Sequence, residues 1–124
     1  MRHLRNLSTS LLIALFACAA SAHGIPKPKH GGVVDVGGEI SFEMVVTPST
    51  MTFFLEDHGK PIPTQDATGE LLLGSETGKK IGALRSAGGN SMTGKLAHFK
   101  PRSRLFVRVV LGDGSTVVGE LIAP

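Results

Sequence analysis

Four histidines are the side chains best suited to chemistry in this sequence: His23, His30, His58 and His98. A neutral imidazole is the commonest metal ligand in proteins. The sequence has no Gly-x-Ser-x-Gly elbow, no phosphate-binding glycine loop and no paired acid and base. The residue types therefore favour metal binding over catalysis, and we expect a protein that is not an enzyme.

The N-terminal leader sets His23 apart from the other histidines. Residues 1–22 combine basic residues, an apolar stretch over 11–16 and the small-residue pattern Ala20-Ser21-Ala22, which together are typical of an export signal. Cleavage after Ala22 makes His23 the first residue of the mature chain. Its α-amine, with an ordinary pKa of about 7.7–8.0, and its imidazole, with one of about 6.5, then form a chelating pair. Two such nitrogens suit Cu(II), although zinc or another divalent ion is also compatible.

A competing interpretation of the leader attaches lipid to Cys18 through the sequence Leu15-Phe16-Ala17-Cys18. Phe16 is bulky where that pattern usually has a small or β-branched residue, so the sequence favours cleavage after Ala22. The apolar stretch of the leader is also shorter than the roughly 20 residues that span a bilayer. We expect a periplasmic protein without a transmembrane segment, in which residues 23–29 form a flexible arm before the folded domain.

Two further histidines are candidate partners of His23. His30 follows it across a stretch with two prolines and can supply a third nitrogen. His58 lies in the turn sequence 56–61, next to Asp57, whose carboxylate could orient the imidazole. The alternative for His58 is a solvated turn residue, because the neighbouring Asp, Gly and Pro make the turn by themselves.

Methionine is a soft ligand that favours Cu(I). Met44 and Met51 alternate with large apolar residues, so we expect both to fill the core instead. Met92 and His98 share one face of a predicted strand. A lone histidine at a strand end is more often hydrogen-bonded within the fold, so His98 is the last of the four candidate ligands.

Short apolar runs, interrupted by Gly, Pro and Asp, predict β structure throughout residues 30–124. Glu39 and Glu43 lie four residues apart, which predicts ordinary solvated acids on the outer face of one strand. The sequence 112–115 predicts a hairpin turn. The pattern predicts an all-β fold, an immunoglobulin-like antiparallel sandwich of seven to eight strands. The expected strands are 33–36, 40–47, 51–56, 69–73, 80–85, 91–99, 103–111 and 116–122.

Charge is segregated along the chain. Removing Arg2 and Arg5 with the leader lowers the 13 Lys and Arg residues to 11, against 10 Asp and Glu residues. Residues 79–108 hold eight basic residues and no acid, which could form a phosphate-binding stripe. Export and the lack of stacking aromatic residues argue against a nucleic-acid partner. We expect acidic and basic strands to neutralise each other across the sheet instead.

Four segments carry a resemblance to a known group of proteins: 30–34 (HGGVV), 42–46 (FEMVV), 54–62 (FLEDHGKPI) and 87–94 (AGGNSMTG). Together they are similar to small secreted bacterial sandwich proteins that accompany copper or heavy-metal efflux systems. The expected N-terminal His23 is also similar to the first residue of periplasmic copper-resistance sandwich proteins, which ligates Cu(II). The resemblance implies copper as the bound ion and a heavy-metal efflux component as partner.

These observations lead to two hypotheses of function. The first is a periplasmic accessory protein that binds a transition metal through His23 and His30, with His58 and then His98 as further candidates, and buffers it or passes it to an efflux system. The second is a structural or protein-interaction module of the cell envelope, which docks by its strand edges or by its charge-sorted surface and in which the histidines are incidental.

Overall fold

The computed structural model describes residues 27–35 and 39–124. The predicted leader, Cys18 and His23 lie outside these residues. The described chain is all-β and contains nine strands and no helix: β1 (Val33–Val34), β2 (Ile40–Val46), β3 (Thr50–Asp57), β4 (Lys60–Pro61), β5 (Thr68–Leu73), β6 (Lys79–Ser86), β7 (Ser91–Lys95), β8 (Arg104–Val110) and β9 (Thr116–Ile122). No described segment is a helix that could cross a bilayer.

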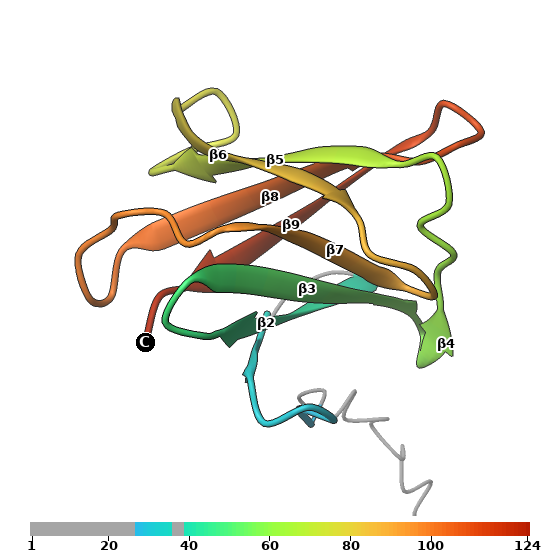
Figure 1. The fold of residues 1–124 in the computed structure, drawn as a ribbon, viewed down its shortest axis with the longest axis horizontal. Coiled ribbons are helices and arrows are strands. Elements are labelled where there is room, and N and C mark those ends of the chain that lie inside the picture. Colours follow the sequence, from blue (N-terminus) through green and yellow to red (C-terminus); the bar gives the residue numbers. More distant parts are fainter. Residues whose placement is uncertain (1–26, 36–38) are drawn as a thin grey trace, which may run out of the picture.

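The strands form one antiparallel sheet in the order β1-β2-β3-β7-β6-β5-β8-β9, with β4 paired to β3. The sheet curls over itself, so that β9 comes back into contact with β2 and β1 without being their hydrogen-bonded neighbour (Figure 1). The result is a nearly closed, sandwich-like barrel. The predicted all-β sandwich is confirmed, and the short strand β4, which was not among the eight expected strands, brings the number to nine.

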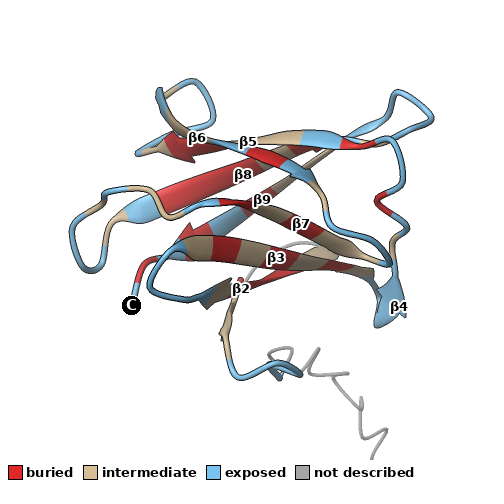
Figure 2. Cartoon of the chain, in the orientation of Figure 1, coloured by how far each residue is buried: buried red, intermediate tan, exposed pale blue. Residues whose placement is uncertain are grey.

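Alternation along the strands places one face of the sheet in the core. In β3, Met51, Phe53 and Leu55 are buried, while the residues between them point outward and are half-buried. Figure 2 shows the same alternation of buried and more exposed residues along the ribbon. The core cluster also includes Met44, so Met44 and Met51 fill the interior as predicted, and Met92 lies in the same cluster.

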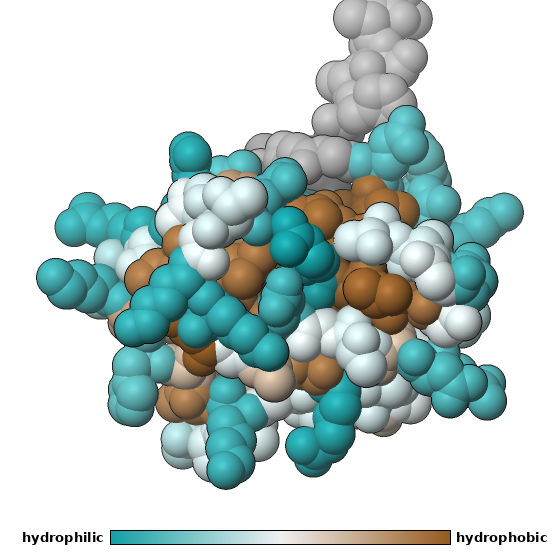
Figure 3. Space-filling model, turned by 90° about the horizontal axis from the view of Figure 1, so that it is seen from above, coloured by the Kyte–Doolittle hydropathy of each residue, from teal (hydrophilic) through white to brown (hydrophobic). Residues whose placement is uncertain are grey.

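Ion pairs cross the outer face of β5, β8 and β9. Glu70 of β5 lies 3.3 Å from Arg108 of β8, and Arg104 of β8 lies 2.8 Å from Glu120 of β9. Lys80 of β6 approaches the same Glu70 at 3.9 Å. The predicted neutralisation between strands is confirmed at these positions. In the view from above, hydrophilic side chains are interspersed with apolar ones over the surface of the domain (Figure 3).

Candidate metal-binding site

The best-defined polar site lies on the outer face of β2 and β3. Glu43 of β2 and Phe54 of β3 are register partners in the antiparallel pair, so both side chains project from the same face. The chain before β1 crosses over this face. It brings His30 onto Phe54 and surrounds the carboxylate of Glu43, which is only 6% exposed.

The carboxylate of Glu43 accepts hydrogen bonds from three backbone amides and one ring nitrogen. The amide of Lys29 donates to Oε1 at 2.8 Å, and the amides of His30 and Gly32 donate to Oε2 at 2.8 and 2.9 Å. The Nδ1 atom of His30 lies 3.0 Å from Oε1. We call this arrangement, formed by Glu43 with residues 29–32, the Glu43 clip.

Glycine allows the clip to turn so tightly. Gly31 has a φ of +73°, which L side chains rarely adopt. A Cβ on Gly32 would lie 2.3 Å from the carbonyl oxygen of Met44, because the chain there runs directly against β2. The His-Gly-Gly sequence therefore lets three amides converge on one carboxylate.

Two opposing effects set the pKa of Glu43. Burial raises this pKa, but the hydrogen bonds from Gly32, Lys29 and His30 together outweigh burial and leave it below the ordinary value of 4.5. Glu43 is therefore ionised at neutral pH. An ionised carboxylate can only accept hydrogen bonds, so Nδ1 of His30 must be the donor in its contact with Oε1.

The imidazole of His30 contacts Phe54 with its ring face and Glu43 with its Nδ1 edge. Its ring stacks on Phe54 with a centroid separation of 3.6 Å and an interplanar angle of 5°. Nδ1 is engaged by Glu43, while the side chain as a whole remains 41% exposed. Nε2 makes no hydrogen bond to any described residue. The neutral ring thus keeps its proton on Nδ1 and leaves the lone pair of Nε2 without a described partner, which is the tautomer in which imidazole can bind a metal through Nε2.

An ion pair extends the site along β3. The ammonium of Lys29 lies 2.9 Å from the carboxylate of Glu56, whose side chain is only 15% exposed. Glu56 and Phe54 project from the same face of β3, so Lys29 and His30 rest on neighbouring outward positions of one strand. The chain leading into the clip is thereby fixed from residue 29 onward.

His58 forms a second, more exposed pair with a carboxylate. It lies in the turn between β3 and β4 with a φ of +48°, and its Nδ1 is 2.5 Å from Oδ1 of Asp57. The side chains of His58 and Asp57 are 67% and 54% exposed. His58 follows Phe54 by four residues, about 13 Å along an extended strand. The structure thus places His58 at the same end of β3 as the clip but not in contact with it.

His98 lies apart from the other described histidines. The predicted strand 91–99 is wrong in its second half: β7 ends at Lys95, and the exposed His98 lies in the following loop, off the face that carries Met92. This loop adjoins the start of β3, since the Leu96 amide donates to the carbonyl of Ser49. The turn with His58 is at the far end of β3, about 23 Å away. The two histidines are therefore too far apart to share one ion.

Among residues 27–35 and 39–124, no three His, Cys, Asp or Glu side chains converge so as to hold a metal ion. His30 is thus a single oriented imidazole in the described part of the chain. His23, which was predicted to begin the mature chain, lies outside the described residues.

Glu43 is the residue of this candidate site that the sequence did not reveal. Alternation correctly predicts its outer-face position, but the expectation of a solvated acid is wrong, because the backbone of residues 29–32 covers it. Backbone amides leave no signature in the sequence. The one signal was the Gly-Gly pair after His30, which permits a tight turn but does not specify what the turn encloses.

A second buried acid, Asp35, follows β1 directly. It is 2% exposed, and its Oδ2 has no hydrogen-bond partner within the described ranges. Burial raises the pKa of Asp35 to about 6, and a backbone hydrogen bond with Phe42 acts in the opposite direction. Asp35 lies opposite Phe42, one position along from the Val34–Glu43 pair, so it faces the core rather than the clip.

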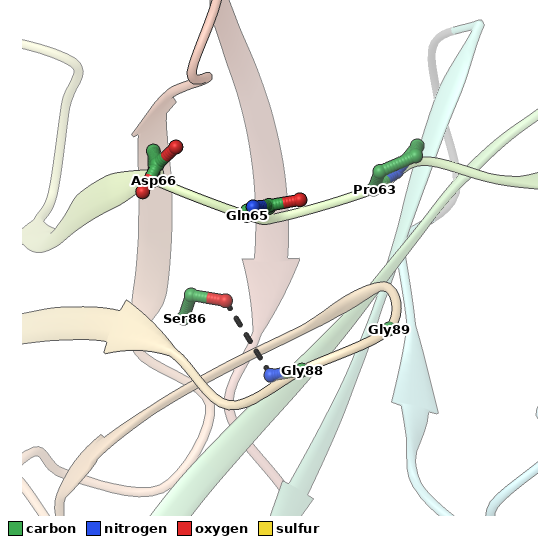
Figure 4. Close-up of a pocket in the computed structure, with 6 residues that line it drawn as sticks. All are labelled: Pro63, Gln65, Asp66, Ser86, Gly88 and Gly89. Atoms are coloured by element: carbon green, nitrogen blue, oxygen red, sulfur yellow. Dashed lines mark hydrogen bonds between the residues drawn. The ribbon is translucent and has the colours of Figure 1, made fainter.

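A shallow depression of about 440 Å³ lies between the β4–β5 connection and the β6–β7 turn. Pro63, Gln65 and Asp66 line one side, and Ser86, Gly88 and Gly89 line the other (Figure 4). Ser86 uses its hydroxyl to accept a hydrogen bond from the Gly88 amide at 3.4 Å. Asp66 is the one ionisable residue in the lining, so the depression offers no set of converging groups comparable with the clip.

No protein-family model, curated protein or solved structure matches this chain.

Proposed function

We propose that this protein is a non-catalytic periplasmic accessory protein that binds a transition metal, with His30 as a ligand through Nε2. The observation that carries the proposal is a half-exposed imidazole whose Nδ1 is held by an ionised, buried carboxylate, while its Nε2 makes no hydrogen bond to a described residue. Metal-binding histidines commonly have this arrangement, because the carboxylate fixes the ring orientation and makes the nitrogen more basic.

The amine and imidazole of His23 are the proposed partners of His30. His23 precedes Lys29, where the clip begins, by six positions, and an extended chain of six residues spans about 20 Å at most. The mature chain end can therefore reach Nε2 of His30 and also the turn that carries His58. Imidazole and amine nitrogens favour Cu(II) over the other divalent ions of the first transition row. Copper is accordingly the proposed ion, and the protein would buffer it or pass it to an efflux component.

The test uses the exported protein, whose first residue is identified as His23 by mass spectrometry. Cu(II) and Zn(II) are titrated by calorimetry into the wild type and into His23→Ala, His30→Ala and His98→Ala. We expect His23→Ala and His30→Ala each to weaken Cu(II) binding about tenfold or more, equivalent to about 1.4 kcal/mol. His98→Ala is the matched control and should bind like the wild type.

Two results would overturn the proposal. The first is a wild type that binds neither ion, which would leave the interaction module as the better hypothesis. The second is a His30→Ala variant whose affinity equals that of the wild type, since the oriented imidazole would then play no part. A His58→Ala variant in the same series measures whether the exposed pair in the turn contributes to the same site.

A further inference from the structure

We infer that Glu43 is a positioning residue, which sets the metal affinity of His30 and couples metal binding to the closure of the clip. This inference rests on the proposed function. Glu43 does not face outward as a ligand itself, because both carboxylate oxygens are already engaged by donors from residues 29–32. Its effect on a metal is exerted through the ring and backbone of His30.

The first part of the argument concerns the ring. Without an acceptor at Nδ1, a neutral imidazole distributes its proton between both nitrogens, and the ring can turn about its side-chain bonds. Glu43 removes this freedom by accepting the Nδ1 proton, while Phe54 supports the ring face at 3.6 Å. Carboxylates that orient a metal-binding histidine in this way typically change metal affinity by about 10–100-fold.

The second part concerns the backbone. Oε2 of Glu43 binds the amides of His30 and Gly32, and Oε1 binds the amide of Lys29, so the same carboxylate fixes both the ligand and the chain that carries it. A metal that holds His30 in place therefore also favours the closed clip. Coupling of this kind is reciprocal, so an open clip must weaken metal binding by the same factor.

The test compares Glu43→Gln with Glu39→Gln, an exposed glutamate four residues earlier that serves as the matched control. Glutamine keeps the shape of the side chain, but its NH2 group is a hydrogen-bond donor and cannot accept the bonds that one carboxylate oxygen accepts in the wild type. By Cu(II) calorimetry we expect Glu43→Gln to bind about 10–100-fold more weakly and Glu39→Gln to bind like the wild type. Nitrogen-15 NMR of the metal-free wild type should show the His30 proton on Nδ1, whereas Glu43→Gln should show both tautomers.

Hydrogen exchange supplies a readout of the coupling. Zn(II), which is diamagnetic, should slow exchange of the amides of Lys29, His30 and Gly32 in the wild type. If Glu43→Gln binds with wild-type affinity while His30→Ala does not, the role of Glu43 is refuted and the proposed function stands. If the wild type binds no metal, both fail. If Glu43→Gln does not fold, measurements on the wild type still test the inference. A His30 proton on Nε2, or exchange at the three amides that does not change with metal, would refute it.

Discussion

A Gly119→Ala substitution is expected to lower the free energy of unfolding by about 3 kcal/mol. Gly119 is buried in β9, where the sheet curls back onto β2. A Cβ at this position would lie 2.2, 2.6 and 2.8 Å from Cδ2, Cε2 and Cγ of Phe42. Phe42 is fully buried, so its ring can move away only by disturbing the rest of the core. We therefore expect an effect at the upper end of the usual range for overpacking.

Urea denaturation of Gly119→Ala and Gly82→Ala measures this effect. Gly82 is a strand glycine with room for a methyl group, since the nearest atom to its Cβ position is 3.5 Å away. The Gly82→Ala substitution should change the free energy of unfolding by less than about 0.5 kcal/mol. In a double-mutant cycle, Phe42→Leu should recover part of the loss in Gly119→Ala, since the smaller side chain relieves the clash. Equal stability of the two glycine variants would contradict the close packing of β2 on β9.

An Asp35→Asn substitution is expected to stabilise the protein increasingly as the pH rises from 4 to 7. The pKa of Asp35 is raised from 3.8 to about 6 in the folded state. Between these values the folded state keeps a proton that the unfolded state has lost, so the free energy of unfolding of the wild type falls with rising pH. A shift of about two pKa units corresponds to about 3 kcal/mol once both states are ionised. Asparagine is neutral throughout and does not incur this loss.

Urea denaturation at several pH values between 4 and 7.5 tests the prediction for Asp35. Asp113→Asn is the control, because hydrogen bonds from Ser115 lower the pKa of Asp113 below this pH range and its difference from the wild type should therefore stay constant. Asp113 therefore contributes stability above its unfolded pKa of about 3.8, and this contribution disappears as the pH falls through the folded pKa. A constant difference between Asp35→Asn and the wild type across this pH range would contradict the assignment.

The strands could be predicted from the sequence because the local pattern determines them. The predicted 40–47 is β2 (Ile40–Val46), and the predicted 116–122 is β9 (Thr116–Ile122). Alternation and turn residues act over a few positions, which is the range that a sequence pattern covers. The order of the strands in the sheet, in contrast, depends on contacts between residues that are distant in the sequence. The pairing of β3 with β7 joins residues about forty positions apart, and no local pattern specifies it.

The candidate site shows the same division. The capacity of an imidazole to bind a metal is a property of the residue type, so His30 could be selected as a candidate ligand from the sequence. The burial of Glu43 depends on backbone amides, which every residue except proline carries. The sequence around Glu43 therefore does not indicate that this side chain is buried. His98 was misplaced because Leu96 and Ala97 continue the apolar pattern of β7, whereas β7 itself ends at Lys95, one position after its last buried residue, Gly94.

The use of backbone donors also determines which positions of residues 29–32 can vary. Three of the four bonds to Glu43 come from amides, so the path of the chain depends on the glycines at 31 and 32 but not on the side chain at 30. At position 30, the amide bonds to Glu43 thus fix the main chain, whatever side chain the residue carries. A different side chain at position 30 should therefore leave the three amide bonds to Glu43 in place.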